Sequence, residues 1–292
     1  MVVVRLTGGL GNQLFQYAAA RRLSLVRGTE LVLDTGWFRH EAAGYPAARP
    51  YELRHLELPA RVVSLSPQTI ARWEQGLTAR VGRWPGRRIR LPVIRQSEDW
   101  SGLDERVLDG PADVVLDGYW QNEGYFRDVA ETLRAELRLP AAPGPRFAQL
   151  LEAIASSEAI AVHLRRGDYV TVPQVAEVHG TLELAYYREA VGLVAERAGS
   201  DAHVFVFSDD PEWAEAHLVF DLPTTHVGRT GSSATAELRL MASCRHHVVA
   251  NSSYSWWGAW LAERPGQVVV APTRWTRRTD SSAIVPARWM RI

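Results

Sequence analysis

Apolar and polar positions along the chain form blocks that favour strands and helices in turn. The first apolar run, Val2 to Leu6, is continuous, as in a strand buried inside a parallel sheet. After a glycine-rich turn, apolar residues recur at helical spacing to about Arg27, and Asn12 is placed to cap this helix. A second strand is predicted at residues 31–33. The chain therefore opens as a strand–helix–strand unit.

The segment that follows, residues 35–110, is less regular and contains six arginines between Arg80 and Arg95. A solvated surface is the simpler explanation of this stretch, and contact with a phosphate-bearing or membrane-linked acceptor is the alternative. Strand character resumes at residues 114–116, and a helix is predicted at 123–137.

A proline-rich segment, Leu139 to Pro145, then has the composition of a linker. It predicts an N-terminal α/β domain at residues 1–143 and a C-terminal Rossmann-like domain at residues 144–292.

Strands alternate with helices beyond the linker, which is typical of a doubly wound parallel sheet. The pattern predicts, in order, a strand at 159–164, a helix at 182–197, a strand at 203–207, a short helix after Pro211, a weak strand near Thr225, a helix at 234–243, a strand at 247–250, a helix at 253–263 and a strand at 267–271.

Composition limits the partners of the chain. Its 292 residues include 33 basic and 33 acidic side chains, so no overall field attracts nucleic acid, and any anion site must be local. Cys244 is the single cysteine, which excludes an internal disulfide and a cysteine-cluster zinc site. No uncharged run approaches the roughly 20 residues that span a bilayer, and the N-terminal run is too short for a signal peptide. We expect a cytoplasmic protein and leave open a peripheral contact with the inner face of the cell membrane.

The end of the strand at 159–164 is the most informative segment for function. Arg165 and Arg166 follow it directly, and Gly167 and Asp168 come next. A guanidinium group matches two phosphate oxygens at once, and ligands of open α/β sheets bind at the carboxyl ends of strands. The arginine pair therefore predicts a diphosphate site, with a solvated strand end as the alternative.

The glycine-rich turn near the N-terminus is a second candidate. A turn of this kind can hold a phosphate at a helix N-terminus, and Gly9, Gly11 and Asn12 are the candidate contacts. The turn is neither a dinucleotide fingerprint, because Leu14 occupies the position of the last glycine, nor a P-loop. Tight turning explains the glycines equally well, and the Asn12 amide favours ligand contact.

A third candidate follows the strand at 203–207, where Ser208, Asp209 and Asp210 precede Pro211. One aspartate is expected to cap the helix that Pro211 begins. A carboxylate here can accept hydrogen bonds from N1 and the exocyclic amine of guanine. A metal site is the alternative, but adjacent side chains lean in opposite directions, so we prefer the nucleobase.

A fourth group of polar residues, Asn251, Ser252 and Ser253, stands at a predicted helix start and offers a second anion site. Trp256 and Trp260 share a face of that helix and are expected to pack against the sheet.

His163 lies on the strand before the arginines. It is interpreted equally well as a contact to a base or ribose and as a core histidine.

The string His163-Leu164-Arg165-Arg166-Gly167-Asp168 matches H-x-R-R-x-D, the hallmark of the bacterial α-1,2-fucosyltransferase family, which the chain resembles. The likeness includes residues 8–18, 117–121 and 251–261, and residues 60–105 match no part of it. One departure is Glu237, where such proteins more often carry Asp.

The resemblance implies a GT-B-like fold of two Rossmann-like halves facing across a cleft. The implied reaction moves L-fucose from GDP-β-L-fucose to the 2-hydroxyl of a galactoside, with inversion and without metal or cofactor. The acceptor would be a β-galactoside oligosaccharide or a lipid-linked glycan, bound on the side of the N-terminal half.

The resemblance also implies roles for single residues in that reaction. Arg165 would bind the β-phosphate, Asp168 would be the general base or hold an arginine, and Asn12 would face the sugar–phosphate oxygen. The remaining donor contacts would be His163 and Asp210 at the guanosine, and Ser252 and Ser253 beside the diphosphate. Two alternatives remain: a metal-dependent glycosyltransferase that uses Asp209 and Asp210, and a non-catalytic carbohydrate- or nucleotide-binding protein.

Overall fold

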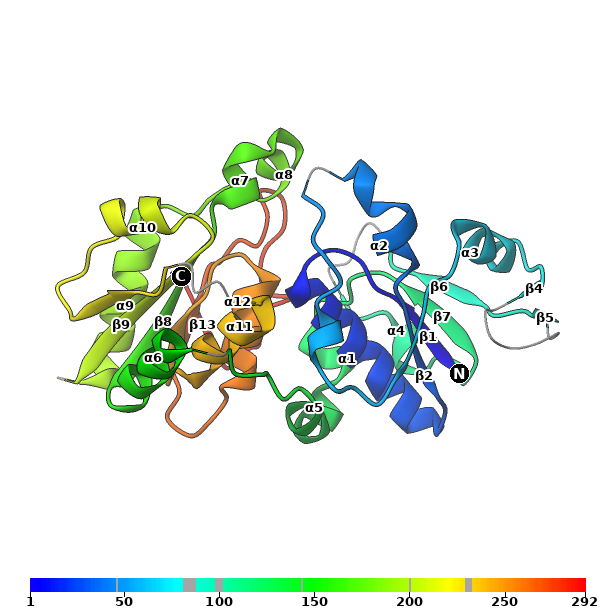
Figure 1. The fold of residues 1–292 in the computed structure, drawn as a ribbon, viewed down its shortest axis with the longest axis horizontal. Coiled ribbons are helices and arrows are strands. Elements are labelled where there is room, and N and C mark those ends of the chain that lie inside the picture. The colour runs from blue at the N-terminus through cyan, green and yellow to red at the C-terminus, as the bar shows by residue number, and fades with distance from the viewer. Residues whose placement is uncertain (46, 81–87, 98–101, 143, 200, 229–232) are drawn as a thin grey trace. The chain divides into compact units, whose positions relative to one another are not determined.

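The computed structural model describes residues 1–45, 47–80, 88–97, 102–142, 144–199, 201–228 and 233–292. The chain divides into two compact units, Met1–Arg138 and Leu139–Ile292 (Figure 1). The division falls after residue 138, whereas the linker composition predicts it after residue 143. The assignment of the acceptor to the first unit and of the nucleotide to the second stays a prediction.

The N-terminal unit is built on a five-stranded sheet in the order β3-β2-β1-β7-β6, in which every pair is parallel. Its strands are β1 (Val2–Arg5), β2 (Leu31–Asp34), β3 (Arg61–Val63), β6 (Val93–Arg95) and β7 (Val114–Asp117). A separate antiparallel pair joins β4 (Ala79–Arg80) and β5 (Arg88–Ile89). The helices are α1 (Leu10–Arg27), α2 (Gly36–His40), α3 (Pro67–Glu74), α4 (Glu105–Leu108) and α5 (Ala130–Glu136), with 3-10 turns at Ala42–Gly44, Leu53–His55, Glu123–Tyr125 and Arg127–Val129.

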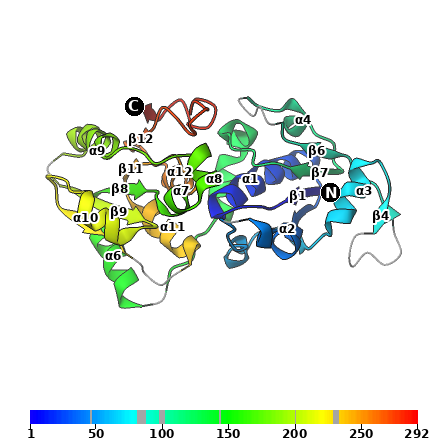
Figure 2. The same ribbon diagram turned by 90° about the horizontal axis from the view of Figure 1, so that it is seen from above.

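Helices lie on both faces of this sheet (Figure 2). Val3 and Val115 pack with Ile70 and Trp73 of α3 on one face. Because side chains alternate along a strand, Val2 and Val4 point to the opposite face, and α1 contacts β1 and β2. Double coverage explains why the strands are apolar without interruption.

Three details of the N-terminal unit differ from the sequence prediction. The helix α1 begins at Leu10 with Gly9 as its N-cap, so Asn12 lies inside the first turn and does not cap it. The helix predicted at 123–137 is two 3-10 turns followed by α5, because the Asn122 side chain accepts from the Gly124 amide and starts a tight turn there. The arginine-rich stretch lies partly outside the described residues.

The C-terminal unit holds a six-stranded parallel sheet in the order β10-β9-β8-β11-β12-β13. Its strands are β8 (Glu158–Leu164), β9 (Ala202–Ser208), β10 (Thr224–His226), β11 (His246–Val248), β12 (Val269–Ala271) and β13 (Met290–Arg291). Its helices are α6 (Pro145–Ala155), α7 (Gly167–Thr171), α8 (Pro173–Val178), α9 (Leu184–Ala198), α10 (Pro211–His217), α11 (Ala234–Ser243) and α12 (Ser253–Leu261). The doubly wound parallel sheet predicted for this half is confirmed.

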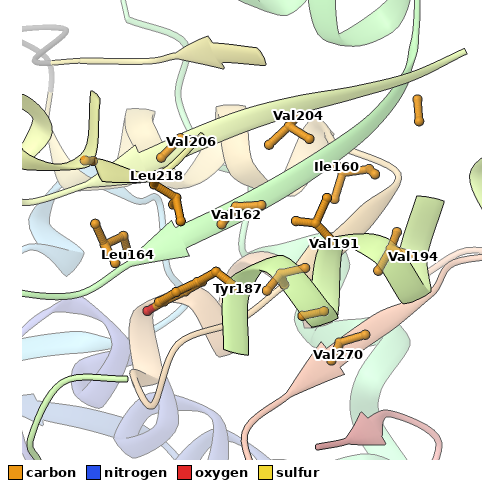
Figure 3. Close-up of a cluster of buried hydrophobic side chains, with 14 residues drawn as sticks. Ile160, Val162, Leu164, Tyr187, Val191, Val194, Val204, Val206, Leu218 and Val270 are labelled. Carbon is orange, nitrogen blue, oxygen red and sulfur yellow. The ribbon is translucent and has the colours of Figure 1, made fainter. Parts of the chain in front are cut away.

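One core of this unit packs β8 against α9 and α10 (Figure 3). Ile160, Val162 and Leu164 of β8 face Tyr187 and Val191 of α9. Ala159, Ala161 and His163 alternate with them and therefore face the other side, where the His163 ring lies 5.6 Å from the Tyr254 ring of α12. The arginines thus follow a strand that is buried on both faces.

Four elements of the C-terminal unit were not predicted, namely α6, α7, α8 and the short strand β13. Residues 144 and 145 carry linker composition, yet Gly144 is the N-cap of α6 and Pro145 is its first residue. The first residue of a helix has no amide hydrogen bond within the helix, so proline is favoured there. A proline in the sequence can therefore mark the start of a helix as well as a linker. The short helices α7 and α8 follow the arginine pair directly.

Candidate functional site

Arg165 is held by two carboxylates at the carboxyl end of β8. Its Nη2 pairs with Asp168 Oδ1, and its Nη1 lies 2.6 Å from Asp209 Oδ2. The guanidinium carbon lies 5.1 Å from the centre of the Tyr169 ring. Charge-assisted bonds to two fixed carboxylates restrict the rotamers of a long side chain, so Arg165 is oriented before any ligand arrives.

Asp209 also fixes the backbone that follows Arg165. Its Oδ1 accepts hydrogen bonds from the amides of Arg166 and Gly167, at 2.9 and 3.2 Å. A Cβ on Gly167 would overlap Asp209 Oδ2 and lie 2.9 Å from Asp209 Cγ, so only glycine permits this approach. The prediction that Asp209 or Asp210 caps the helix beginning at Pro211 is confirmed in position, because Asp210 is the N-cap residue of α10, although its side chain makes no capping hydrogen bond there. Asp209 binds the amides at the start of α7.

Arg166 points to a different set of partners. Its Nε lies 3.2 Å from Asp210 Oδ2, and its guanidinium carbon lies 3.6 Å from the centre of the Trp213 ring. The His217 ring is parallel to Trp213 at 4.3 Å. Two groups this close to one ring centre need opposite faces, so Trp213 lies between Arg166 and His217. The two arginines are therefore held apart by separate carboxylates.

His163 is buried beside this cluster, with 5% of its surface exposed. Desolvation lowers the pKa of its imidazole well below 6.5, and the Asp209 charge opposes this shift only in part. The ring is therefore neutral at neutral pH. Its Nδ1 is buried and has no hydrogen-bond partner among the described residues.

Asn251 lies between β11 and α12 and is committed to the protein itself. Its Nδ2 lies within 3.2–3.3 Å of the carbonyls of His179, Gly180 and Trp275. The backbone carbonyl of Asn251 accepts from the Tyr169 hydroxyl at 3.0 Å, and the Tyr169 and His179 rings stack at 4.7 Å. Asn251 thus joins the segment of α7 and α8 to the loop that contains Trp275.

The remaining predicted residues of this unit surround the same edge. Ser208 Oγ accepts from the Asp210 amide at 3.0 Å, and Ser252 is the N-cap of α12 without a side-chain capping bond. Ser253 is the first residue of that helix. Trp256 and Trp260 are fully buried and stack at 6.1 Å, which confirms that they pack in the core.

The glycine-rich turn belongs to the N-terminal unit and is described within it. Gly8 has φ of 70°, and a Cβ there would meet Asn12 Nδ2 at 2.7 Å. Asn12 Oδ1 accepts from Gln121 Nε2 at 2.7 Å. Gly9 caps α1 and Gly11 is buried in its first turn. The positive φ of Gly8 and its approach to Asn12 give that glycine a steric function that stands without any ligand.

The structure brings Arg165, Arg166, Asp168, Asp209 and Asp210 into one cluster around the start of α7. Sequence reasoning missed the aromatic partners of the arginines, Tyr169 and Trp213. Tyr169 was discoverable as the residue after the H-x-R-R-x-D string, whereas Trp213 is close only because α10 turns back beside β8.

Two kinds of feature are absent from the described part of the chain. No group of three or more His, Cys, Asp or Glu side chains there is arranged to hold a metal ion. No helix among the same residues is long and apolar enough to cross a membrane.

Known proteins resemble this chain along most of its length. The model of "Glycosyl transferase family 11" matches residues 92–292. An alpha-1,2-colitosyltransferase of Escherichia coli is 31% identical over 297 residues, which covers 100% of this chain and 99% of that protein. A galactoside alpha-(1,2)-fucosyltransferase 1 of Saimiri sciureus is 24% identical over 265 residues, covering 87% of this chain and 63% of that protein.

The fold also has a solved counterpart. The structure of Arabidopsis thaliana FUT1, determined as a mutant in complex with GDP, superposes with a TM-score of 0.53 at 13% identity, over 98% of this chain and 74% of that chain. That likeness confirms the predicted GT-B-like fold of two Rossmann-like α/β units. Because a family model covers more than half of the chain and a relative above 30% identity spans all of it, the chain belongs to glycosyl transferase family 11.

Proposed function

We propose that this glycosyltransferase moves L-fucose from GDP-β-L-fucose to the 2-hydroxyl of a terminal galactoside, forming an α-1,2 linkage with inversion. The observation that carries the proposal is the pair of guanidinium groups at the carboxyl end of β8, of which Arg165 is held by Asp168 and Asp209 and Arg166 by Asp210. Relatives named for α-1,2 transfer of colitose and of fucose support the linkage.

The reaction needs a cation at the leaving group. When the bond between fucose and GDP breaks, negative charge develops on the β-phosphate. A guanidinium group fixed beforehand at that position stabilises the transition state more than the ground state. Arg165 is the residue we assign to this role, because its two carboxylates restrict it without burying it completely.

Asp168 suits the role of a positioning residue better than that of general base. Its carboxylate is paired with Arg165 Nη2. The carboxylate oxygen that accepts from Arg165 is committed to orienting that guanidinium group. Because of this pairing, we propose that a group other than Asp168 is the general base, and we do not name that group.

Asp210 is the better candidate for contact with guanine. It is more exposed than Asp209, at 36% against 23% of the side chain, and its Oδ2 has an ion pair with Arg166 at 3.2 Å. The neutral His163, with a buried Nδ1, is the second guanosine contact that we propose. Ser252 and Ser253 at the start of α12 would lie beside the diphosphate.

The same contacts argue against a metal bound by Asp209 and Asp210. Asp209 already accepts two backbone amides and one guanidinium group, and Asp210 accepts another. A divalent cation at these oxygens would have to displace both arginines from them. We therefore propose metal-independent transfer, in which arginine supplies the charge that Mg²⁺ supplies in other transferases.

Colitose is a second candidate for the sugar that is moved. The full-length relative at 31% identity is named for colitose transfer, and colitose is L-fucose without its 3-hydroxyl. The arginine cluster would contact the diphosphate of the donor and not its sugar, so it does not distinguish the two sugars. Competition between GDP-L-fucose and GDP-colitose for one acceptor measures the preference directly.

The test is transfer by the purified protein from GDP-L-fucose to lactose and other terminal β-galactosides, with and without excess EDTA. We expect GDP release and a product with an α-linked fucose on O2 of galactose, unchanged by EDTA. Activity that EDTA abolishes and Mn²⁺ restores contradicts the metal-independent mechanism. Binding of GDP-fucose without GDP release in the presence of every acceptor favours the non-catalytic alternative.

A further inference from the structure

Two loops meet at the carboxyl edge of the sheet in the N-terminal unit. Strands β1 and β7 are parallel neighbours, with Val4 opposite Leu116, so the segments that follow them leave from the same edge. Gln16 joins the two segments, because its Oε1 accepts from the Thr7 amide and its Nε2 donates to the Thr7 hydroxyl and to the Gly118 carbonyl. Edges of this kind are where open α/β sheets bind ligands.

The loop after β7 carries backbone strain. Trp120 has φ of 54°, the one positive φ at a non-glycine position among the described residues. A bulky side chain rarely takes that conformation, which surrounding contacts must enforce. Gln96 Oε1 supplies them by accepting from the amides of Tyr119 and Trp120 at 2.7 and 3.3 Å. A Cβ on Gly118 would overlap Gln96 Cβ, so this anchor also requires glycine.

The strained turn separates two adjacent aromatic residues. Trp120 is fully buried, whereas Tyr119 keeps 47% of its surface exposed. Desolvation raises the pKa of the Tyr119 hydroxyl. The backbone that carries this side chain is fixed by the bonds from the Tyr119 and Trp120 amides to Gln96. An exposed aromatic residue on a fixed backbone loses less entropy when a ligand packs on it than one on a mobile loop.

Tyr45 is a second exposed aromatic residue of this unit. It is 61% exposed and packs its edge on Trp37, with ring centres 5.4 Å apart. The polar amides of Asn12 and Gln121 join each other at the same edge, at 2.7 Å.

Aromatic rings beside amides and a hydroxyl are the chemistry that recognises a galactoside. The C–H groups at C3, C4 and C5 of galactose form one apolar face, which packs on an aromatic ring, and the ring hydroxyls bond to neighbouring amides. We infer that Tyr119, with the amides of Asn12 and Gln121 at the same edge, forms the subsite for the acceptor galactose in this unit. This inference rests on the proposed function, since it identifies where the acceptor sugar of that reaction binds.

The experiment compares Tyr119→Ala and Tyr119→Phe with the wild type. Initial rates with lactose at saturating GDP-L-fucose should give an acceptor KM at least about 10-fold higher for Tyr119→Ala, and KM for GDP-L-fucose within about 2-fold. Tyr119→Phe keeps the ring and should raise the acceptor KM much less. Leu77→Ala, at an exposed apolar residue of the same unit, is the control for surface truncation.

Binding of lactose is measured separately by saturation-transfer NMR, which does not depend on turnover. The wild type should give signals from the galactose C–H groups, and Tyr119→Ala should lose them while its thermal unfolding midpoint stays near that of the wild type. An unchanged lactose KM or unchanged NMR signals in Tyr119→Ala overturn the subsite. A wild type that binds lactose at Tyr119 and transfers no sugar to any galactoside overturns the proposed function and leaves the subsite standing.

Discussion

Asp209 lies with one carboxylate oxygen 2.6 Å from Arg165 Nη1, while its other oxygen accepts from the backbone amides that follow Arg165. One carboxylate thus fixes both the side chain of Arg165 and the direction of the chain beyond it. The orientation of Arg165 therefore depends on the position of β9 as well as on that of β8, because Asp209 directly follows β9.

Replacing Arg165 tests its role at the leaving group. Arg165→Ala removes the guanidinium group and should lower kcat by roughly 10²–10³-fold, as loss of an oxyanion donor does. Arg165→Lys keeps the charge and loses the forked geometry, so it should recover only part of that loss. Steady-state kinetics with GDP-L-fucose measure both. The exposed Arg188→Ala in α9 is the control, and near-normal turnover of Arg165→Ala contradicts the assignment.

The close approach of Asp209 to Gly167 makes a prediction about stability. A Cβ on Gly167 overlaps Asp209, so Gly167→Ala should lower the free energy of unfolding by about 1–3 kcal/mol. Gly192 in α9 has nothing within 4 Å of an added Cβ, and Gly192→Ala should raise the free energy of unfolding by about 0.5–1 kcal/mol. Urea unfolding of both variants gives the comparison. Equal effects at the two positions would show that the contact with Asp209 has no steric consequence.

The Asn251 side chain makes a second stability prediction. Asn251→Asp replaces an amide donor by a carboxylate that repels the carbonyls of His179, Gly180 and Trp275, so it should destabilise the protein by more than the roughly 1–3 kcal/mol of an unsatisfied buried group. Amide hydrogen exchange across residues 167–180 should rise with it. Tyr169→Phe removes only the bond to the Asn251 carbonyl and should cost about 1 kcal/mol. Unchanged exchange in Asn251→Asp would refute the connecting role.

Buried histidines predict how stability depends on pH. Desolvation lowers the pKa of His247 to about 3 in the folded protein, against 6.5 as its ordinary value. Below pH 6.5 the unfolded chain binds a proton at this imidazole and the folded protein does not. The free energy of unfolding therefore falls with falling pH, by up to about 1.4 kcal/mol per pH unit for this group.

The measurement is urea unfolding at several pH values between about 4 and 7. His247→Gln should give a shallower slope than the wild type in this window, whatever its stability at pH 7. The exposed His40→Gln serves as the matched control. A wild-type slope in His247→Gln contradicts the prediction.

Much of the fold could be predicted because the central strands of both units are buried on two faces. Residues 159–164 and 203–207 are apolar runs of the length of strands, each with a single histidine, and the structure places β8 and β9 within one residue of them. The helix predicted at 234–243 is α11 with the same bounds. Where burial alone determines the pattern of apolar residues, the sequence predicts the strand or helix correctly.

The elements that were missed are short or depend on tertiary contacts. Gly144 and Pro145 have the composition of a linker and also begin α6, so composition alone does not decide between a linker and a helix start. The start of α7 depends on Asp209, which is more than forty residues away in the sequence. Pairing across such a distance is visible only in the folded chain.

The sequence predicted which residues form the candidate site, but not the hydrogen bonds and ion pairs between them. Arg165, Arg166 and Asp168 were singled out from their place after a strand, and the structure joins them to Asp209 and Asp210. The commitment of Asn251 to three backbone carbonyls could not be predicted, because an asparagine beside serines has the same pattern whether it faces a ligand or the protein. The role of each site residue in catalysis stays a prediction.

The arginine cluster also determines how an anion would approach it. Two guanidinium groups and three carboxylates, Asp168, Asp209 and Asp210, give a formal charge of +2 − 3 = −1. A nucleoside diphosphate is therefore not drawn in from a distance, and must exchange partners with the carboxylates at contact range. Electrostatic steering is then weak, and the association rate of GDP should change little with ionic strength.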